Sequence, residues 1–262
     1  MLHIILECIA IAFGAGLIFG IFGGGSGLIM MPGYYYLMRH FSLVASHQMQ
    51  VAVGTTAITS GILGSVAAYH QYKSGHIDFK IIKKMTLGIL SGTVIAVILL
   101  NIVPSATLKK IFGIVVILVA IWLLTYKMER DNKHWSLAGF WNYIRTTCIG
   151  ILWFLLGVAV FNVPYLHKCK IDMRKAVGNA TFISAFFSFL AGLLLMLSGY
   201  FAIGASKSHI GYVNILLCLV SIIPSSIASY LGAKVSTKLP KDKMKIIYAL
   251  LIFIVGSLML FT

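Results

Sequence analysis

Two short polar motifs in this otherwise apolar chain place hydroxyl and amide groups at matching positions. Residues 52–60 read AVGTTAITS, and residues 176–184 read AVGNATFIS. Polar groups that recur in both halves of a duplicated membrane chain tend to line a solute path near the middle of the bilayer. These groups donate hydrogen bonds without a fixed charge, so they suit a small anion that must be released as well as bound. The motifs supply four candidate solute contacts: Thr55, Thr56, Asn179 and Thr181.

A run of small residues, GGGSG at residues 23–27, is the second feature that could bind a solute. Five small residues in a row predict an interruption of a helix. An unwound segment exposes N–H groups, and the helix that begins there points its positive dipole end at the gap, which favours a small anion. A matching, milder interruption is expected at residues 157–164. The residues assigned to the two breaks are Gly23, Gly24, Gly25, Ser26, Gly27 and Asn162 as solute contacts, with Pro32 and Pro164 as helix-breaking residues.

Each of these features also has a purely structural interpretation. Threonines in membrane helices commonly hydrogen-bond back to their own helix. Glycines four residues apart allow two helices to approach closely, and we expect this of Gly16 with Gly20 and of Gly88 with Gly92. A dinucleotide-binding loop is not supported at residues 23–27, because no strand is predicted before it.

Ionisable side chains are scarce in the long apolar stretches, and no Asp or Glu falls in the middle of one. A carboxylate proton relay is therefore not supported. Histidines near the ends of the stretches are expected to lie at the interface, with proton handling as the alternative. The sequence contains no P-loop, no HExxH motif and no Cys/His cluster, so no metal or cofactor is expected. The candidates for gating or proton-linked roles are His47, His70, Gln50 and Arg174.

The composition predicts an all-α, polytopic integral membrane protein. Hydrophobic residues make up 60% of the 262 residues and charged residues 10%, and the mean hydropathy is +0.97. Long uniform apolar runs of about 20 residues predict membrane helices rather than a barrel. The first run, residues 3–37, would form a helix of about 52 Å, too long for one crossing, so it must break. The apolar stretches fall at residues 3–37, 49–69, 85–103, 111–126, 146–166, 176–199, 212–231 and 246–261, which gives about eight spans, or ten with the short segments.

The order of the landmarks predicts two homologous repeats. A glycine-to-proline element, the polar motif, a glycine turn and a second proline follow one another in each half. We therefore divide the chain into a first membrane repeat at 1–127, a polar linker at 128–145 and a second membrane repeat at 146–262. The basic residues, which give a net charge of +15, lie between the apolar stretches. They are expected to face lipid headgroups rather than nucleic acid.

The motifs resemble one known family, the sulfite exporter TauE/SafE permeases, over nearly the whole chain. The resemblance rests on GIFGGGSGLIMMP at residues 20–32, on the motif at 52–60, on GHID at 75–78 and on LGAK at 231–234 followed by Leu239 and Pro240. The second half departs from the family pattern at residues 158–162, where more glycine is typical. The resemblance implies a multi-pass permease of the cell (inner) membrane that moves sulfite or another small organosulfur or organic anion.

The expected mechanism is alternating access, with the substrate held between the two repeats near the bilayer midplane. The lipid bilayer and a small anion are the expected partners, and the sequence leaves a homo-oligomer open. Two alternatives from other classes remain. An integral membrane enzyme would use His47, His70 and Ser26, although the chain offers no convergent acid and base set. A membrane subunit without transport would show a tightly packed repeat interface with no polar cavity.

Overall fold

The computed structural model describes residues 2–44, 46–125, 135–156, 161–206, 208–235, 249–250 and 253–260. Its elements are α1 (Leu2–Phe22), α2 (Gly27–His40), α3 (Gln48–Lys73), α4 (Phe79–Ile102), α5 (Ser105–Thr125), α6 (Phe140–Leu156), α7 (Asn162–Lys168), α8 (Met173–Ile203), β1 (His209–Ile210), β2 (Val213–Asn214) and α9 (Ile215–Val235). Residues 253–260 are also helical. Within the described chain, six helices are long and apolar enough to cross a membrane, namely α1, α3, α4, α5, α8 and α9. The predicted all-α, polytopic architecture is confirmed.

The first apolar stretch breaks where the glycine run lies. Helix α1 ends at Phe22 and α2 begins at Gly27. The turn between them uses left-handed backbone at Gly23, with φ +74°, and at Gly25, with φ +88°. Glycine adopts such angles at no steric cost, whereas other residues do not. The small residues thus explain both the place and the sharpness of the interruption.

The two prolines assigned as helix-breaking residues do not break helices. Pro32 lies inside α2, and Pro164 is the third residue of α7. A proline in the first turn removes an N–H that has no partner within the helix, so Pro164 is tolerated there. Pro32 removes one backbone hydrogen bond, but the change of chain direction has already been made at the glycine turn. Gly157, the counterpart of the glycine turn, falls outside the described residues.

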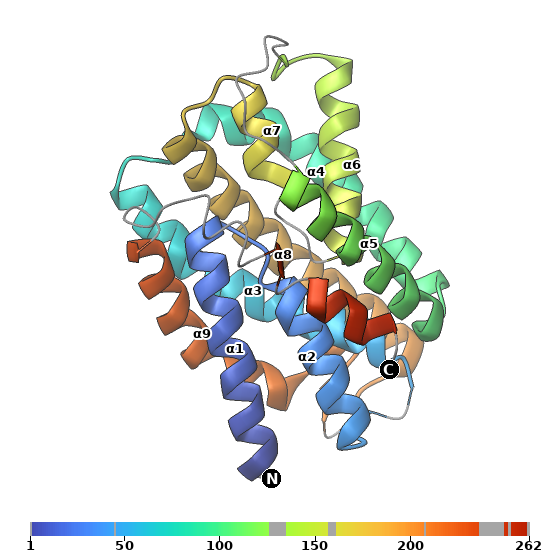
Figure 1. Ribbon diagram of the computed structural model, residues 1–262. Coiled ribbons are helices and arrows are strands. Elements are labelled where there is room, and N and C mark those ends of the chain that lie inside the picture. The colour runs from blue at the N-terminus through green and yellow to red at the C-terminus, as the bar shows by residue number, and fades with distance from the viewer. Residues whose placement is uncertain are drawn as a thin grey trace.

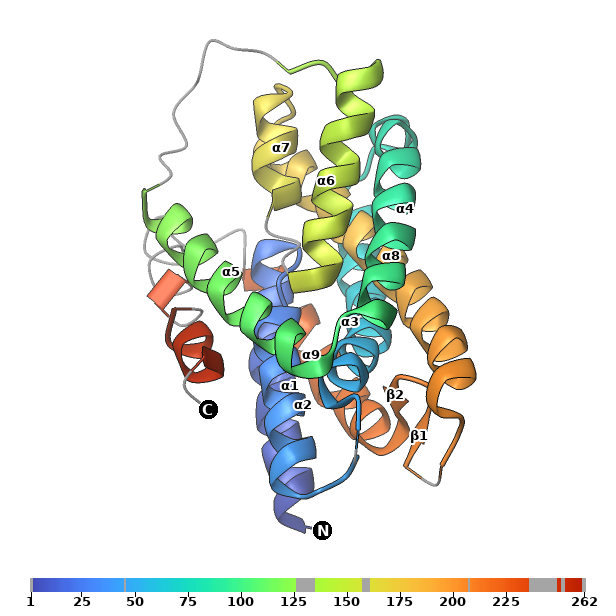
Figure 2. The ribbon, with the colours of Figure 1, turned by 90° about the vertical axis from the view of Figure 1, so that its right-hand side faces the viewer.

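The helices of the second half run opposite to their counterparts in the first half. In Figure 2, α1 rises from the N-terminus and α2 descends beside it in the lower half, whereas α6 descends and α7 rises in the upper half. Helices α3 and α8 are likewise antiparallel, as are α4 and α9 (Figures 1 and 2). The α1–α2 turn therefore lies at about the same height as the lower end of α6. The two halves are therefore arranged as inverted rather than parallel repeats.

The helix packing has the same reciprocal form. The most extensive contacts join α1 to α9, α3 to α8 and α4 to α6. Helix α6 is the counterpart of α1, and α4 is the counterpart of α9. The α1–α9 contact of one half therefore corresponds to the α6–α4 contact of the other. Helix α3 lies at the centre, and 83% of its most apolar 18-residue segment is buried inside the protein. The two counterpart helices α3 and α8 therefore form the middle of the molecule, and the other pairs flank them.

Glycines let these helices approach closely, as the GxxxG pairs predicted. A Cβ atom added to Gly20 would lie 2.9 Å from the carbonyl carbon of Gly232, and one added to Gly92 would lie 2.9 Å from the Cα of Gly150. Side chains also tie α2 into this bundle. The Tyr34 hydroxyl donates a hydrogen bond of 2.7 Å to Ser221 Oγ of α9. The packing prediction for the glycine pairs is confirmed.

The two ends of the molecule differ in charge. We call the lower end in Figure 2 the N-terminal side, because α1 begins there, and the opposite end the basic side. The basic side carries the α3–α4 connection, the start of α6 and the α7–α8 connection, and α9 runs toward it. Of the lysines and arginines in the described chain, those on the N-terminal side are Arg39, Lys109 and Lys110. Those on the basic side are Lys73, Lys80, Lys83, Lys84, Arg145, Lys168, Lys170, Arg174, Lys175 and Lys234.

Candidate functional site

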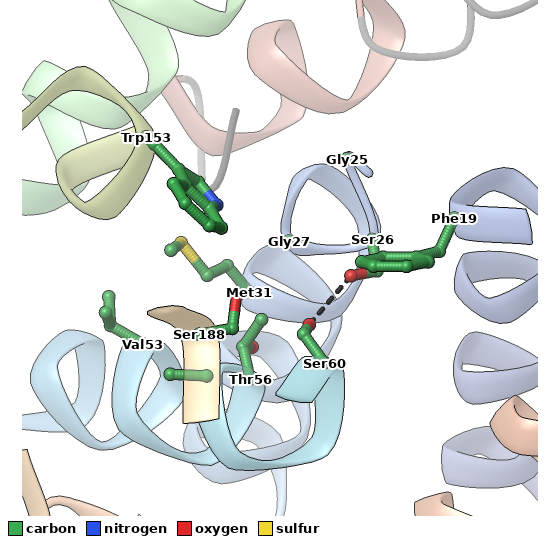
Figure 3. A pocket seen from close by; sticks show the side chains of 11 residues that line it. Phe19, Gly25, Ser26, Gly27, Met31, Val53, Thr56, Ser60, Trp153 and Ser188 are labelled. Carbon is green, nitrogen blue, oxygen red and sulfur yellow. Dashed lines mark hydrogen bonds between the residues drawn. The ribbon is translucent and has the colours of Figure 1, made fainter. Parts of the chain in front are cut away.

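A polar cavity lies at the interruption between α1 and α2. Its enclosed space is small, ≈ 20 Å³, which is about enough for one water molecule. Figure 3 shows Trp153 of α6 on one side of it, with Thr56 and Ser60 of α3 across from it. Both halves of the chain therefore contribute to the lining. The lining residues are Phe19, Gly25, Ser26, Gly27, Met31, Val53, Thr56, Ala57, Ser60, Trp153 and Ser188.

The cavity offers neutral hydrogen-bonding groups and no charged side chain. The Ser26 and Ser60 hydroxyl oxygens lie 2.7 Å apart, so one donates to the other. Thr56 is 3% exposed, and its Oγ1 has no hydrogen-bond partner within the protein. A buried hydroxyl without a partner costs free energy, and this cost is removed when a bound solute or water accepts its hydrogen bond. Thr56 is therefore the polar group most clearly available to a ligand.

Helix α2 adds a positive dipole end at the same place. It begins at Gly27, and its N-cap residue Ser26 makes no side-chain hydrogen bond to the first turn. The Ser26 hydroxyl is instead directed to Ser60, as the dashed line in Figure 3 shows. The start of a helix of 14 residues carries a partial positive charge. The cavity thus combines neutral donors with a favourable potential for negative charge.

Four of the predicted contacts lie at this cavity, and two more lie close to its edge. Gly25, Ser26, Gly27 and Thr56 line it, and Gly24 is buried within the same turn. Gly23 packs against the second half, because a Cβ added there would lie 2.7 Å from Thr181 Oγ1. That hydroxyl donates to the Val177 carbonyl oxygen of its own helix.

Two other predicted contacts, Thr55 and Asn179, do not line the cavity. Thr55 Oγ1 donates to the Val51 carbonyl oxygen and accepts from the Asn214 N–H at 2.8 Å. Asn179 Nδ2 donates to the Lys175 carbonyl oxygen, and its Oδ1 accepts from the Asp78 N–H at 2.9 Å. The polar atoms of both fully buried side chains are therefore occupied by protein partners.

The second half contributes buried polar groups that have no protein partner. Asn162, at the start of α7, is fully buried, and neither its Oδ1 nor its Nδ2 is hydrogen-bonded. Ser184 Oγ of α8 is also buried without a hydrogen-bond partner in the protein. Neither residue is among those that line the cavity. By the spacing of the polar motifs Ser184 corresponds to Ser60, and the glycine-to-proline spacing aligns Ser26 with Val158, which has no hydroxyl.

The residues predicted for gating or proton transfer lie away from the cavity. His47 is exposed at the start of α3, and its ring lies 5.9 Å from that of Tyr212. His70 packs against Tyr230 near the ends of α3 and α9. Gln50 is buried and donates to the Val103 carbonyl oxygen at 2.8 Å. Arg174 is exposed at the start of α8 on the basic side.

Seven lining residues were not among the predicted contacts, and three of these seven, Ser60, Ser188 and Trp153, carry a side-chain oxygen or nitrogen. Ser60 lies one helical turn beyond Thr56 on α3, so helical periodicity offered a signal for it. Ser188 lies one turn beyond Ser184 on α8. Trp153 belongs to an apolar stretch in which nothing distinguishes it from a lipid-facing residue. Among the described residues, no group of three or more His, Cys, Asp or Glu side chains could hold a metal ion.

The fold and the cavity together define a polytopic helical membrane protein with an internal polar site at a helix interruption. The chain belongs to the sulfite exporter TauE/SafE family, whose pattern it matches over residues 8–259. It is therefore a membrane permease and not an enzyme.

Comparison with individual proteins gives the same class. A "Probable membrane transporter protein" of Haemophilus influenzae is 27% identical over 267 residues, covering 98% of each chain. A "Probable membrane transporter protein" of Methanocaldococcus jannaschii is 26% identical and covers 96% of this chain and 94% of its own. No solved structure matches the chain.

Proposed function

We propose that this permease carries sulfite, or another small organosulfur or organic anion, across the cell (inner) membrane by alternating access. The single observation that supports this most is the cavity at the α1–α2 interruption. It joins residues of α1, α2, α3, α6 and α8 around a helix start and an unpartnered Thr56 hydroxyl. A site of neutral donors and a helix dipole stabilises an anion without holding it too tightly for release.

The proposed binding residues follow from the lining. Thr56, Ser60, Ser26 and Ser188 supply hydroxyl groups, and the Gly25–Gly27 backbone approaches the solute where side chains would block it. The enclosed space of ≈ 20 Å³ holds about one water molecule, so a solute the size of sulfite or a small sulfonate would enter only when the lining residues move apart, as alternating access requires. The repeats at 1–127 and 146–262, joined by the linker at 128–145, would be the two bodies that move relative to each other. Asn162 does not line the cavity, but both polar atoms of its buried amide lack a protein partner, so it would be the contact from the second interruption once the repeats move.

The test is anion flux in proteoliposomes with Thr56→Val and its matched control. Sulfite, thiosulfate, sulfate, sulfoacetate and acetate are loaded separately, with and without a pH gradient. Valine has the shape of threonine but cannot donate, so Thr56→Val should lower flux of the transported anion about fivefold, the effect of one neutral hydrogen bond. The control is Thr86→Val, which removes a hydroxyl that bonds only to Ile82 of its own helix. Loss of flux in both variants, or in neither, would contradict the proposed site, and absence of flux for every anion would contradict the proposed function.

A further inference from the structure

The repeated polar motifs make the same pair of contacts on opposite sides of the cavity. In the first half, a Cβ added to Gly54 would lie 2.9 Å from the carbonyl carbon of Tyr212. In the second half, a Cβ added to Gly178 would lie 2.8 Å from the Cβ of His76. Tyr212 follows Gly211, and His76 follows Gly75, the glycines of the two equivalent turns. Each motif glycine therefore packs on the turn of the other half.

The next residue of each motif completes the contact with a hydrogen bond. Thr55 Oγ1 accepts from the N–H of Asn214 at 2.8 Å, and Asn179 Oδ1 accepts from the N–H of Asp78 at 2.9 Å. Asn214 and Asp78 both stand three residues after the turn glycine. The hydroxyl oxygen of Thr55 and the amide oxygen of Asn179 thus accept equivalent hydrogen bonds in the two halves.

The residues that donate these hydrogen bonds also start the helices that follow. Asp78 Oδ1 accepts from the Lys80 N–H at the start of α4, and Asn214 Oδ1 accepts from the Leu217 N–H at the start of α9. Such N-cap bonds fix where a helix begins. A displacement of either contact would therefore move a whole helix of the opposite repeat.

We infer that these contacts are two joints that close the cavity, one on each side, and that transport opens them in turn. The N-side joint consists of Gly54 and Thr55 with Tyr212 and Asn214. The basic-side joint consists of Gly178 and Asn179 with His76 and Asp78. On α3 the cavity residues Val53 and Thr56 flank Gly54 and Thr55, so the N-side joint lies directly beside the cavity, and Asn179 lies on α8 between its start and Ser188. This inference rests on the proposed alternating-access function.

The two joints differ in how far their residues are exposed to solvent. Tyr212 and Asn214 are each 1% exposed, whereas His76 and Asp78 are only half-buried. Water already reaches part of the basic-side joint, so breaking its hydrogen bond leaves a less isolated N–H group. We expect the N-side joint to depend more strongly on its hydrogen bond than the basic-side joint does.

The test is side-specific labelling of a cavity cysteine in the whole protein. Ala57→Cys, a lining residue without a polar atom, is introduced after Cys8, Cys148, Cys169 and Cys218 are replaced by serine. An impermeant thiol reagent is applied to either face of oriented vesicles. Thr55→Val removes the acceptor of the Asn214 N–H. In the closed joint this N–H is then buried without a partner, whereas in the open joint it can bond to water, so the substitution favours the open state. Labelling from the N-terminal side should rise roughly tenfold, because such a buried group destabilises the closed state by about that factor.

Asn179→Val should raise labelling from the basic side, and by a smaller factor. The matched controls keep an acceptor at each place: Thr55→Ser, and Asn179→Thr, which uses the residue found at this position in the first half. Both should label at the background rate. A purely structural role would leave labelling unchanged or raise it equally from both sides, and either result would overturn the inference. Side-specific labelling without flux of any anion would contradict the proposed function and leave the two joints supported.

Discussion

Gly23 shows how one residue fixes the position of the site. Its left-handed φ of +74° creates the end of α1, and the missing side chain leaves room for Thr181 of the other half. Alanine at this position would adopt a strained backbone, at about 1–2 kcal/mol, and its Cβ would lie 2.7 Å from Thr181 Oγ1. Gly23→Ala should therefore lower the thermal unfolding temperature of the detergent-solubilised protein.

The control for Gly23→Ala separates backbone strain from the contact. Gly75, just after the end of α3, also has a positive φ, +71°, but nothing lies within 4 Å of the position its Cβ would take. Gly75→Ala should lower the unfolding temperature less than Gly23→Ala. Equal losses would show that Thr181 contributes nothing to the requirement for glycine at residue 23.

His76 gives the basic-side connection a dependence on pH. Its Nδ1 lies 2.9 Å from Gln71 Oε1, to which the neutral ring donates. Burial, followed by the charge of Arg174, lowers the pKa of His76 below its ordinary value, although Asp172 acts in the opposite direction and His70 adds to the lowering. A lowered pKa means that the folded protein binds this proton less well than the unfolded chain does. The stabilising contribution is therefore present above about pH 6.5 and is lost as the pH falls through the lowered pKa.

His76→Gln should remove this part of the pH dependence, because glutamine can still donate to Gln71 but does not titrate. The unfolding temperature is measured from pH 8 to pH 5 for both proteins. The wild type should lose more stability than His76→Gln below pH 6.5. Parallel curves for wild type and His76→Gln would contradict the assignment.

The neighbours Thr55 and Thr56 mark the limit of sequence reasoning at the residue scale. Their repetition correctly indicates that the motif matters, but repetition does not distinguish a contact with solute from a contact between halves. Helical periodicity does not help either, because α3 is buried on nearly all of its faces. Only the position of Asn214, 159 residues away along the chain, separates the roles of the two hydroxyls.

At the scale of elements, the α1–α9 packing supports a prediction with a control in the same helix. A Cβ on Gly16 would lie 2.9 Å from the Cα of Ser225, whereas a Cβ on Gly14 would meet nothing within 4 Å. Gly16→Ala should push the helices apart and lower the unfolding temperature, because close packing is the main attraction between membrane helices. Gly14→Ala should leave the temperature unchanged or raise it, since alanine favours the helix by about 1 kcal/mol. The reverse order would contradict the packing argument.

The interruptions were predicted unevenly, for physical reasons that differ between the halves. The glycine run at residues 23–27 left few alternatives to a turn, because so many small residues weaken a helix. Pro32 and Pro164 were weaker signals, since membrane helices tolerate proline when other groups satisfy the freed carbonyl. The structure places both inside helices. Pro32 therefore marked the neighbourhood of the α1–α2 break and not its position.

At the scale of the whole molecule, the α1–α2 turn decides on which side of the membrane each later connection lies. Counting each apolar stretch as one crossing divides the basic residues 12 to 9, which hardly favours an orientation. That count fails because residues 3–37 contain two antiparallel helices, and α2 returns the chain to the side on which α1 began (Figure 2). In the described chain, the basic side then carries all the lysines and arginines except Arg39, Lys109 and Lys110.

This charge difference predicts the orientation of the protein in the membrane. Connections rich in lysine and arginine remain in the cytoplasm, so the basic side should face inward and the N-terminal side outward. Two exposed lysines distinguish this arrangement from the single-crossing count, which places Lys110 and Lys170 on the same face. Lys110→Cys and Lys170→Cys are made separately in a cysteine-free background and treated with an impermeant maleimide on intact cells. Residue 110 should be labelled at once and residue 170 only after the cells are permeabilised. Labelling of both in intact cells would contradict the inverted arrangement, and labelling of residue 170 alone would reverse the orientation while leaving the inverted repeats intact.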